Sequence, residues 1–139
     1  MHHPQRISVV ITTYNRSDAL LQVLSALCLQ DDKDFEVVVA DDGSRHEHVE
    51  AILNASSARQ LHLVHVWHPD IGFTASRVRN RGVEAASGDY IVFMDGDCVP
   101  EVDFIRRHRS LAQRDFLVNG SRVMLSKGFT RQVLAGQAT

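Results

Sequence analysis

Apolar runs and amphipathic stretches alternate along the chain, and this alternation predicts strands and helices in turn. Short continuous apolar runs are typical of strands that are buried on both faces. Such a run is present at residues 7–12, and further strands are predicted at residues 35–40, 61–67 and 90–94. Apolar residues at helical spacing predict helices at residues 18–30, 46–56, 74–86 and 100–114. Since strand and helix alternate with short connections, we expect an α/β fold with an open, mainly parallel sheet flanked by helices.

The remaining boundaries rest on weaker signals. Ser17 is the expected N-cap of the first helix, and Pro100 is expected near the first turn of the fourth. Residues 116–125 have strand character, and residues 129–139 predict a short helix. Since no repeat, low-complexity segment or linker interrupts the pattern, we expect residues 1–139 to form a single domain.

Polar clusters follow three of the four predicted strands. They are Thr12–Arg16, Asp41–Ser44 and Asp95–Asp97. In a parallel sheet the carboxyl ends of the strands lie on one edge, and ligands bind there, where the strand order reverses. We therefore expect these clusters, which are far apart in the sequence, to form one site.

The composition narrows the class of protein. Of the 139 residues, 44% are hydrophobic and 23% are charged, which is typical of an ordinary globular domain. No apolar run is long enough to cross a bilayer, and the first residues lack the apolar core of a signal peptide. Cys28 and Cys98 give neither a disulfide framework nor a CxxC pair. We therefore expect a cytoplasmic protein without a transmembrane segment, with a peripheral location at the inner face of the membrane as an alternative.

Charge is distributed unevenly along the chain. The net charge is −2. Residues 1–69 hold 5 basic and 9 acidic side chains, whereas residues 70–139 hold 10 basic and 8 acidic side chains. The basic surplus consists mostly of arginine, whose planar guanidinium suits phosphate, although a GC-rich genome gives the same bias. The balance is far from the basic stripe of a nucleic-acid-binding protein, so we expect no nucleic-acid partner.

The segment Asp95-Gly96-Asp97 is the sharpest candidate for chemistry. Two carboxylates at the end of a buried strand repel each other unless a cation or a hydrogen-bond donor neutralises them. Mg²⁺ and Mn²⁺ prefer such oxygen ligands and complete their coordination with water and substrate phosphates. The alternative is a solvated turn, in which Asp and Gly are common.

The other two clusters offer groups that suit a nucleoside. Asp41 and Asp42 can accept hydrogen bonds from a base or from ribose hydroxyls, and Tyr14 can stack on a base. The alternatives are ordinary turns, with Ser44 capping the second helix and Tyr14 packing on its neighbours.

Arginines and histidines give less specific signals. Arg77 and Arg81 share one helix face and Arg79 points elsewhere, so either face can reach a diphosphate or remain solvated. Among the histidines, His62, His65 and His68 are three residues apart within a strand-like segment. They therefore do not share one strand face, which argues against a zinc site.

The ordered set of motifs resembles family 2 glycosyltransferases with the Rossmann-like GT-A fold. The segments are SVVITTYNR (8–16), VVVADDGS (37–44) and IGFTASRVRNRGVEAASGDYIVFMDGDCVP (71–100). The resemblance covers residues 7–125 and is strongest to bacterial members that assemble surface polysaccharide or lipopolysaccharide. It implies an inverting hexosyl or N-acetylhexosaminyl transferase that uses a nucleotide-diphosphate sugar, expected to be a UDP-sugar, to glycosylate a saccharide or glycolipid acceptor.

The resemblance also implies roles for individual residues. Thr12 and Tyr14 would hold the base and ribose, and Asp41 or Asp42 would take the uracil edge. Arg79 would lie near the diphosphate. Asp95 would contact the ribose or the metal, and Asp97 would bind the divalent cation, Mn²⁺ or Mg²⁺.

Two departures from the family pattern are apparent. Close relatives often carry arginine just after Gly-Phe, where this chain has Thr74. Family members are also longer, and their catalytic base lies in the acceptor-binding portion, whereas Glu101, Asp103 and Asp115 come too early to match it. We therefore expect this chain to be the nucleotide-sugar-binding portion, incomplete at its C-terminus, and to turn over poorly.

Other classes of function remain as alternatives. A non-catalytic or truncated module that binds nucleotide or another chain, including a second copy of itself, is the main one, since an uncovered apolar surface favours association. A haloacid-type phosphatase needs an aspartate after the first strand, where this chain has Thr12-Thr13-Tyr14. A dinucleotide-binding domain needs GxGxxG at that place, which is absent.

Overall fold

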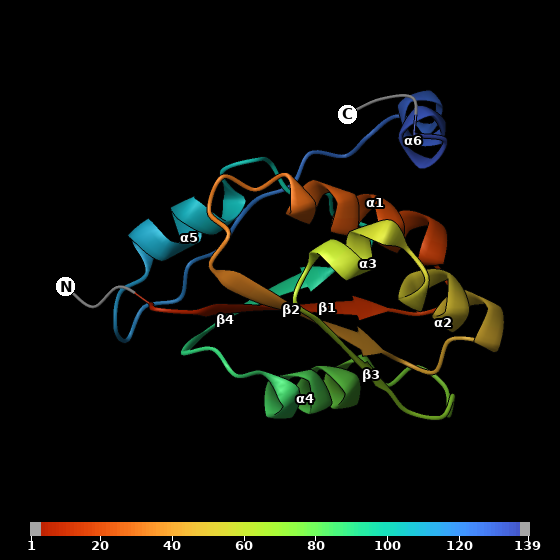
Figure 1. Cartoon of the computed structure of the whole chain (residues 1–139), viewed down its shortest axis with the longest axis horizontal. Helices are drawn as coiled ribbons and strands as arrows, with labels where there is room; N and C mark the ends of the chain where they lie inside the picture. Colours follow the sequence, from red (N-terminus) through yellow and green to blue (C-terminus); the bar gives the residue numbers. More distant parts are fainter. Residues whose placement is uncertain (1–3, 137–139) are drawn as a thin grey trace.

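The sheet lies at the centre of the molecule and has four parallel strands in the order β3-β2-β1-β4 (Figure 1). The structure is a computed structural model and describes residues 4–136. The strands are β1 (Ile7–Thr13), β2 (Phe35–Asp41), β3 (Leu63–Trp67) and β4 (Tyr90–Asp95). The expectation of an open parallel sheet is confirmed.

Helices cover both faces of this sheet, as Figure 1 shows for α1 and α3 on one side and α4 on the other. They are α1 (Ser17–Cys28), α2 (His46–Leu53), α3 (Ser56–Gln60), α4 (Ala75–Ala85), α5 (Phe104–Leu111) and α6 (Lys127–Leu134). Within residues 4–136, none of these helices combines the length and apolar character that a membrane crossing needs.

Each face of the sheet buries its own apolar cluster because side chains alternate along a strand. On one face, Val9 of β1 and Val37 of β2 pack with α1 side chains such as Leu24. On the other face, Val10 packs with Val78 of α4. Strand β2 is buried throughout and β1 at every position except Thr12, which explains why their sequences are mostly apolar.

The expected strand over residues 116–125 is wrong. These residues form no strand, and β4 pairs only with β1 among the described strands. Leu117 and Val123 are almost fully exposed. An apolar run becomes a strand only when a neighbouring strand can pair with its backbone, and none lies beside this segment.

Several helix ends also differ from the prediction. Ser17 is the first residue of α1, and the preceding Arg16 is the N-cap, without a side-chain hydrogen bond. Residues 46–56 are divided by an extended residue, Ala55, into α2 and α3. The last helix is α6; the part of the expected helix at residues 137–139 lies outside the described residues.

Helix α5 begins at Phe104 rather than at Pro100. The buried Gln30 side chain holds the preceding turn, because its amide donates to the Glu101 carbonyl (2.7 Å) and its oxygen accepts from the Ile105 amide (3.0 Å). The turn before α5 is therefore fixed against the end of α1 by one buried side chain.

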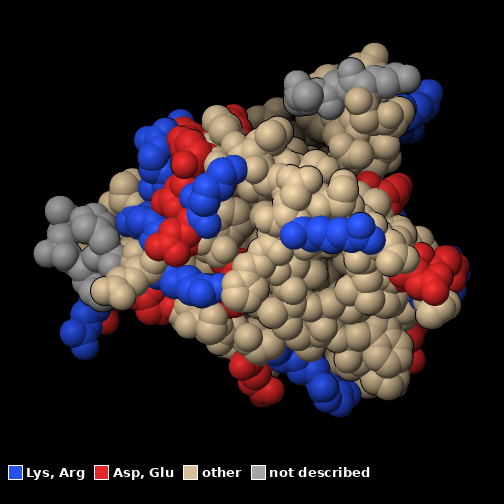
Figure 2. Space-filling model, in the orientation of Figure 1, with Lys and Arg blue, Asp and Glu red and all other residues tan. Residues whose placement is uncertain are grey.

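Opposite charges are interleaved on the surface around α5. Arg106 pairs with Asp31 (2.9 Å) and Arg109 pairs with Asp32 (2.7 Å), which joins the helix to the loop after α1. On the face in Figure 2, basic and acidic side chains accordingly alternate in this region instead of forming one basic surface.

The register aligns the carboxyl ends of the strands on one edge. Thr13 lies opposite Asp41, Asp41 opposite Trp67, and Thr12 opposite Asp95. The chain adds β2 and β3 on one side of β1 and then crosses over to place β4 on the other side. The switch point is therefore between β1 and β4, where open α/β sheets bind ligands.

Candidate functional site

A cavity of about 450 Å³ opens at this switch point. Its walls come from the ends of β1, β2 and β4, the start of α4 and the segment after α5. The lining residues are Thr12, Thr13, Tyr14, Arg16, Asp42, Asp70, Gly72, Phe73, Ala75, Val78, Asp95, Gly96, Asp97 and Arg122. Three separate polar clusters of the sequence thus meet in one space.

The loops after β1 and β2 are tied together beneath the cavity. Asn15 adopts a left-handed backbone (φ 49°), which asparagine tolerates better than most residues. Its amide donates to Ser44 Oγ (2.9 Å), and its side-chain oxygen accepts from the Arg45 amide (2.8 Å). Ser44 therefore joins the two loops and does not cap α2, whose N-cap is Arg45.

Asp41 is fully buried behind the cavity and does not line it. Its carboxylate accepts the Ser44 amide (2.8 Å) and lies 2.9 Å from Nε2 of His65. Burial raises the pKa of Asp41, but the hydrogen bonds from His65 and Ser44 outweigh it, so the pKa lies below its ordinary value. Both carboxylate oxygens are thus engaged by the protein itself.

Asp42 lies on the cavity wall and is held by two other groups. One oxygen lies 2.6 Å from Nε2 of His68 and also accepts the Thr74 hydroxyl; the other accepts the Thr74 amide (3.0 Å). Burial raises the pKa of Asp42, but the bonds from Thr74 and His68 prevail and lower it. Thr74, where close relatives often carry arginine, therefore fixes the orientation of this carboxylate.

Tyr14 projects from the end of β1 into the cavity and is 45% exposed. Its hydroxyl donates to Asp70 (2.6 Å), which raises the pKa of Tyr14 and lowers that of Asp70. The Asp70 backbone can approach because Gly43 has φ 93° and no side chain; a Cβ there would lie 2.6 Å from Asp70 Cα. The tyrosine ring is therefore positioned at the rim by a carboxylate from a different loop.

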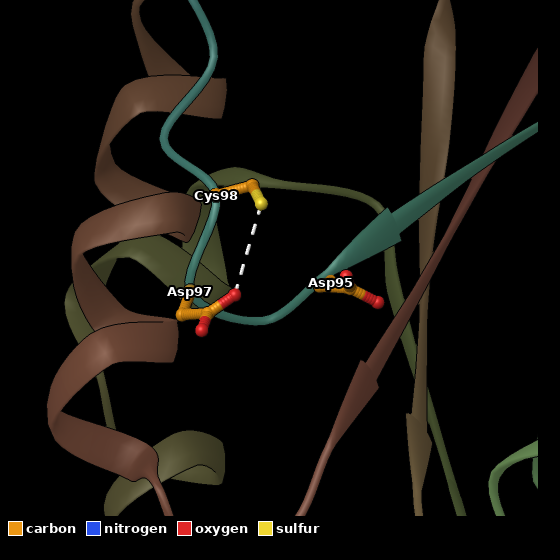
Figure 3. A group of neighbouring side chains, drawn as sticks. All are labelled: Asp95, Asp97 and Cys98. Carbon is orange, nitrogen blue, oxygen red and sulfur yellow. Dashed lines mark hydrogen bonds between the residues drawn. The ribbon is translucent and has the colours of Figure 1, made fainter. Parts of the chain in front are cut away.

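Asp95, Asp97 and Cys98 form a group at the opposite side (Figure 3), where the two aspartates line the cavity. One ligand atom from each lies within 4.8 Å of the others. Asp97 Oδ1 and Cys98 Sγ are 3.7 Å apart. Gly96 allows the turn between the carboxylates, since its amide donates to the Thr12 carbonyl (2.8 Å) and a Cβ would lie 2.6 Å from that oxygen.

Two arginines approach Asp95 from different segments. Nη2 of Arg79, on α4, lies 3.7 Å from one carboxylate oxygen, and Nη1 of Arg122 lies 3.7 Å from the other. Arg122 also lies 3.9 Å from Cys98 Sγ, and its pKa is raised by this contact and by the charges of Cys98 and Asp95. The cluster is therefore negative enough to attract the chain's own cations.

The predicted site residues are only partly brought together. The structure places five of them on the cavity wall: Thr12, Tyr14, Asp42, Asp95 and Asp97. Asp41 lies behind the wall, and Arg79 reaches the cavity only through its contact with Asp95.

Sequence reasoning missed four functional candidates: Asp70, His65, His68 and Arg122. Asp70 follows β3, so the rule that placed the other clusters could have included it. The histidines were tested only as metal ligands, whereas each contacts an aspartate at the end of the neighbouring strand. Arg122 carried no signal, because its segment was predicted to be a strand.

The family model described as Glycosyl transferase family 2 matches residues 8–137. Among curated proteins, the chain is 36% identical over 110 residues to a chondroitin synthase of Escherichia coli, covering 78% of this chain and 16% of that protein. It is 31% identical over 107 residues to the amylovoran biosynthesis glycosyltransferase AmsB of Erwinia amylovora, covering 77% of this chain and 36% of that protein. The chain thus spans only part of the length of these relatives.

Solved structures with a similar fold are found. TarS residues 1–349 of S. aureus, in complex with UDP-GlcNAc, aligns with a TM-score of 0.62 and 27% identity, over 76% of this chain and 30% of that one. The mannosyltransferase PcManGT of Pyrobaculum calidifontis, in complex with GDP-Man and Mn²⁺, aligns with a TM-score of 0.63 and 26% identity. The alignment covers 73% of this chain and 30% of that one.

Proposed function

Because the chain belongs to glycosyl transferase family 2, we propose that it forms the donor-binding part of an inverting glycosyltransferase that uses a nucleotide-diphosphate sugar, with UDP as the nucleotide. The similar TarS structure holds UDP-GlcNAc and the similar PcManGT structure holds GDP-Man, so nucleotide sugars are bound by structures of this fold. The acceptor we propose is a saccharide or glycolipid of the bacterial surface, in keeping with the polysaccharide-making relatives.

The cavity carries this proposal, since it offers the groups for each part of the donor in order. Tyr14 provides an aromatic face at the rim, and Asp42 a carboxylate that can accept from the base. Thr12 and Asp95 face each other across adjacent strands, with Thr12 Oγ1 3.4 Å from the carboxylate, and are placed to meet the ribose. Asp97 and Arg122 lie at the far wall, where the diphosphate would be, and Arg79 contacts Asp95 from outside the lining.

The donor set at the far wall fits a divalent cation. Asp95 and Asp97 supply carboxylate oxygens, which Mn²⁺ and Mg²⁺ prefer, and both side chains are exposed to the cavity. A bound cation would neutralise the charge on the diphosphate leaving group. Nη1 of Arg122 already lies 3.7 Å from Asp95, in keeping with a local attraction for positive charge.

The chain's own residues then perform positioning and charge compensation. The Asp42 carboxylate is fixed by His68 and Thr74, so the base is bound by a group that needs no rearrangement. Arg79 lies close enough to move from Asp95 to a phosphate oxygen as charge builds up on the leaving group. The acceptor hydroxyl attacks from the side opposite the diphosphate.

We assign the catalytic base to no described residue. Glu101, Asp103 and Asp115, the acids after the metal cluster, do not line the cavity. Asp103 is also engaged by Arg107 at 2.6 Å. We expect these 139 residues to bind the donor but to transfer sugar poorly.

Calorimetry of UDP binding with and without Mn²⁺ tests the proposal. We expect the parent chain to bind UDP more tightly with Mn²⁺ and Asp97→Asn to lose this gain. Asp115→Asn removes the same charge from an exposed position outside the cavity and is the matched control. Absence of UDP binding in both conditions would refute the donor site, and an Asp97→Asn variant with the parent's Mn²⁺ response would refute the metal assignment.

A second candidate function is a non-catalytic module that associates through its apolar surface. It is favoured by residues 116–125, where Leu117, Val123 and Met124 are each more than 80% exposed. Sedimentation of the chain without UDP distinguishes it: the module predicts a concentration-dependent dimer whose formation does not depend on Asp97.

A further inference from the structure

We propose that Phe73 is a second aromatic wall for the nucleobase of the donor, in addition to the wall that Tyr14 provides. This inference rests on the proposed function, because it takes the cavity to bind a nucleotide-diphosphate sugar with UDP as the nucleotide. It deepens that function by assigning part of the affinity for the base to a residue of the loop between β3 and α4.

Phe73 combines two properties that are uncommon in one side chain. It is 92% exposed, so almost none of its ring is covered by the rest of the protein. It also lines the cavity at the switch point, where Tyr14 is the other aromatic residue of the lining within residues 4–136. An apolar ring in contact with water gains free energy when a planar ligand covers it. The exposed ring inside the cavity therefore indicates a ligand with a planar, apolar face.

The loop that carries Phe73 is tied at both ends to the two residues proposed to contact the base. At one end, Asp70 accepts the hydroxyl of Tyr14 (2.6 Å). At the other end, the Thr74 amide donates to the carboxylate of Asp42 (3.0 Å), and the Thr74 hydroxyl donates to the same carboxylate. Phe73 is the aromatic residue between these two ties. The loop therefore places its ring in the part of the cavity where the base would lie.

The backbone on both sides of Phe73 is held in place. Gly72 has a left-handed conformation (φ 99°), which glycine adopts without strain, and its amide donates to Asp70 Oδ1 (3.1 Å). On the other side, Thr74 is the N-cap residue of α4. Because the loop is already hydrogen-bonded before a ligand arrives, little backbone entropy is lost when the base binds, and this favours affinity.

Stacking on Phe73 and hydrogen bonding to Asp42 would contribute differently to binding. An aromatic ring stacks on any base, since every base has a π face, and so it adds affinity without selecting among bases. The Asp42 carboxylate can only accept hydrogen bonds, and so it selects a base that presents an N–H group at its edge. The phenylalanine ring has no polar group for the diphosphate. Its removal should therefore weaken the contact with the base and leave the contacts with the phosphates unchanged.

Calorimetry of UDP binding to the 139-residue chain in the presence of Mn²⁺ tests the role of Phe73. We expect Phe73→Ala to bind UDP about tenfold more weakly than the parent, the size expected for one contact between a base and an aromatic ring. Phe73→Tyr keeps a ring and should bind UDP like the parent. Phe116→Ala is the matched control, because it removes the same side chain from a position that is 66% exposed and outside the cavity lining. Since the Phe73 ring is exposed, Phe73→Ala should unfold at the same urea concentration as the parent.

Pyrophosphate and a fluorescent variant show which part of the donor meets Phe73. Pyrophosphate with Mn²⁺ carries the phosphates without the base, so Phe73→Ala should bind it as tightly as the parent. UDP should quench the fluorescence of Phe73→Trp, because a base that stacks on an indole quenches its emission. The parent should be quenched much less, since its one tryptophan, Trp67, does not line the cavity.

The outcomes separate this inference from the proposed function. If the parent binds UDP and Phe73→Ala binds it equally well, Phe73 is not a wall of the base site and the donor site stands. The same conclusion follows if Phe73→Ala weakens UDP and pyrophosphate alike, or if it weakens a UDP-sugar but not UDP, because the ring then acts on the phosphates or the sugar. If the folded parent binds no UDP, both the donor site and the role of Phe73 are refuted.

Discussion

Changing each of the two aspartates at the end of β2 to asparagine should have a different effect, one on stability and the other on UDP binding. Both aspartates are buried and both have their two oxygens bound by the protein, but only Asp42 lines the cavity. We expect Asp41→Asn to destabilise the fold and Asp42→Asn to weaken UDP binding. The resemblance to the family left open which of the two meets the base, and this pair of variants decides it.

The cost of Asp41→Asn follows from its two hydrogen bonds. Asparagine keeps one acceptor oxygen, for Ser44 or for His65, and presents an NH₂ group to the other. A buried hydrogen bond to a charged group is worth about 1.5–3 kcal/mol, so we expect a loss of about that size. This is a large part of the roughly 5–15 kcal/mol by which domains are stable, and urea denaturation measures it directly.

The same variant predicts how stability depends on pH. The pKa of Asp41 in the folded chain lies below its ordinary value of 3.8. The stability that it contributes is therefore fully present above the ordinary pKa and is lost as pH falls through the lower, folded pKa. The difference in unfolding free energy between the parent and Asp41→Asn should be constant from about pH 8 to about pH 5 and should shrink below about pH 4.

For Asp42→Asn we expect UDP affinity to fall by about tenfold or more, equal to about 1.4 kcal/mol, because one of two fixed acceptor oxygens is lost from the cavity wall. Calorimetry on both variants completes the comparison. The reasoning is refuted if Asp41→Asn abolishes UDP binding at unchanged stability while Asp42→Asn binds UDP like the parent.

Three further variants test other parts of the structure. Gly96→Ala places a Cβ 2.6 Å from the Thr12 carbonyl, a rigid backbone atom, so we expect a loss of about 1–3 kcal/mol in urea denaturation and weaker Mn²⁺ binding; an unchanged midpoint contradicts this. Thr74→Val removes the hydroxyl that fixes Asp42, so it should weaken UDP binding and lower the free energy of unfolding by about 1 kcal/mol. Thr130→Val is the control, because the Thr130 hydroxyl donates to the Ser126 carbonyl at the start of α6. Glu36→Gln should destabilise the fold by about 1–3 kcal/mol, since the buried carboxylate joins the Ser8 hydroxyl to the Ser87 amide. These bonds lower the pKa of Glu36 despite its burial, so the loss of stability should shrink in acid. A loss that does not change with pH argues against an ionised Glu36.

Much of the fold is encoded in local sequence patterns. The apolar runs of β1 and β2 are continuous because both faces of these strands are covered, and this determined the parallel sheet. In such a sheet topology alone gathers the strand ends, so the sequence by itself predicts that the Asp41-Asp42 pair, Asp95 and Asp97 lie at one edge.

Tertiary structure decided which of these groups face the cavity and which serve the fold. Asp41 and Asp42 are neighbours in sequence, yet successive side chains of an extended chain point to opposite sides, so one is buried against His65 and the other lines the site. The roles of His65, His68 and Arg122 depend on contacts between residues that are far apart in the sequence, and no local pattern records such contacts.

The segment that was predicted to be a strand shows the same limit most clearly. Residues 116–125 have the composition of a strand, and the sequence determined that much. Strand formation also needs a partner for the backbone hydrogen bonds, and only the arrangement of the other elements shows that none is in place. The position of Arg122, which this segment places beside the Asp95 carboxylate, is therefore a feature of the tertiary structure alone.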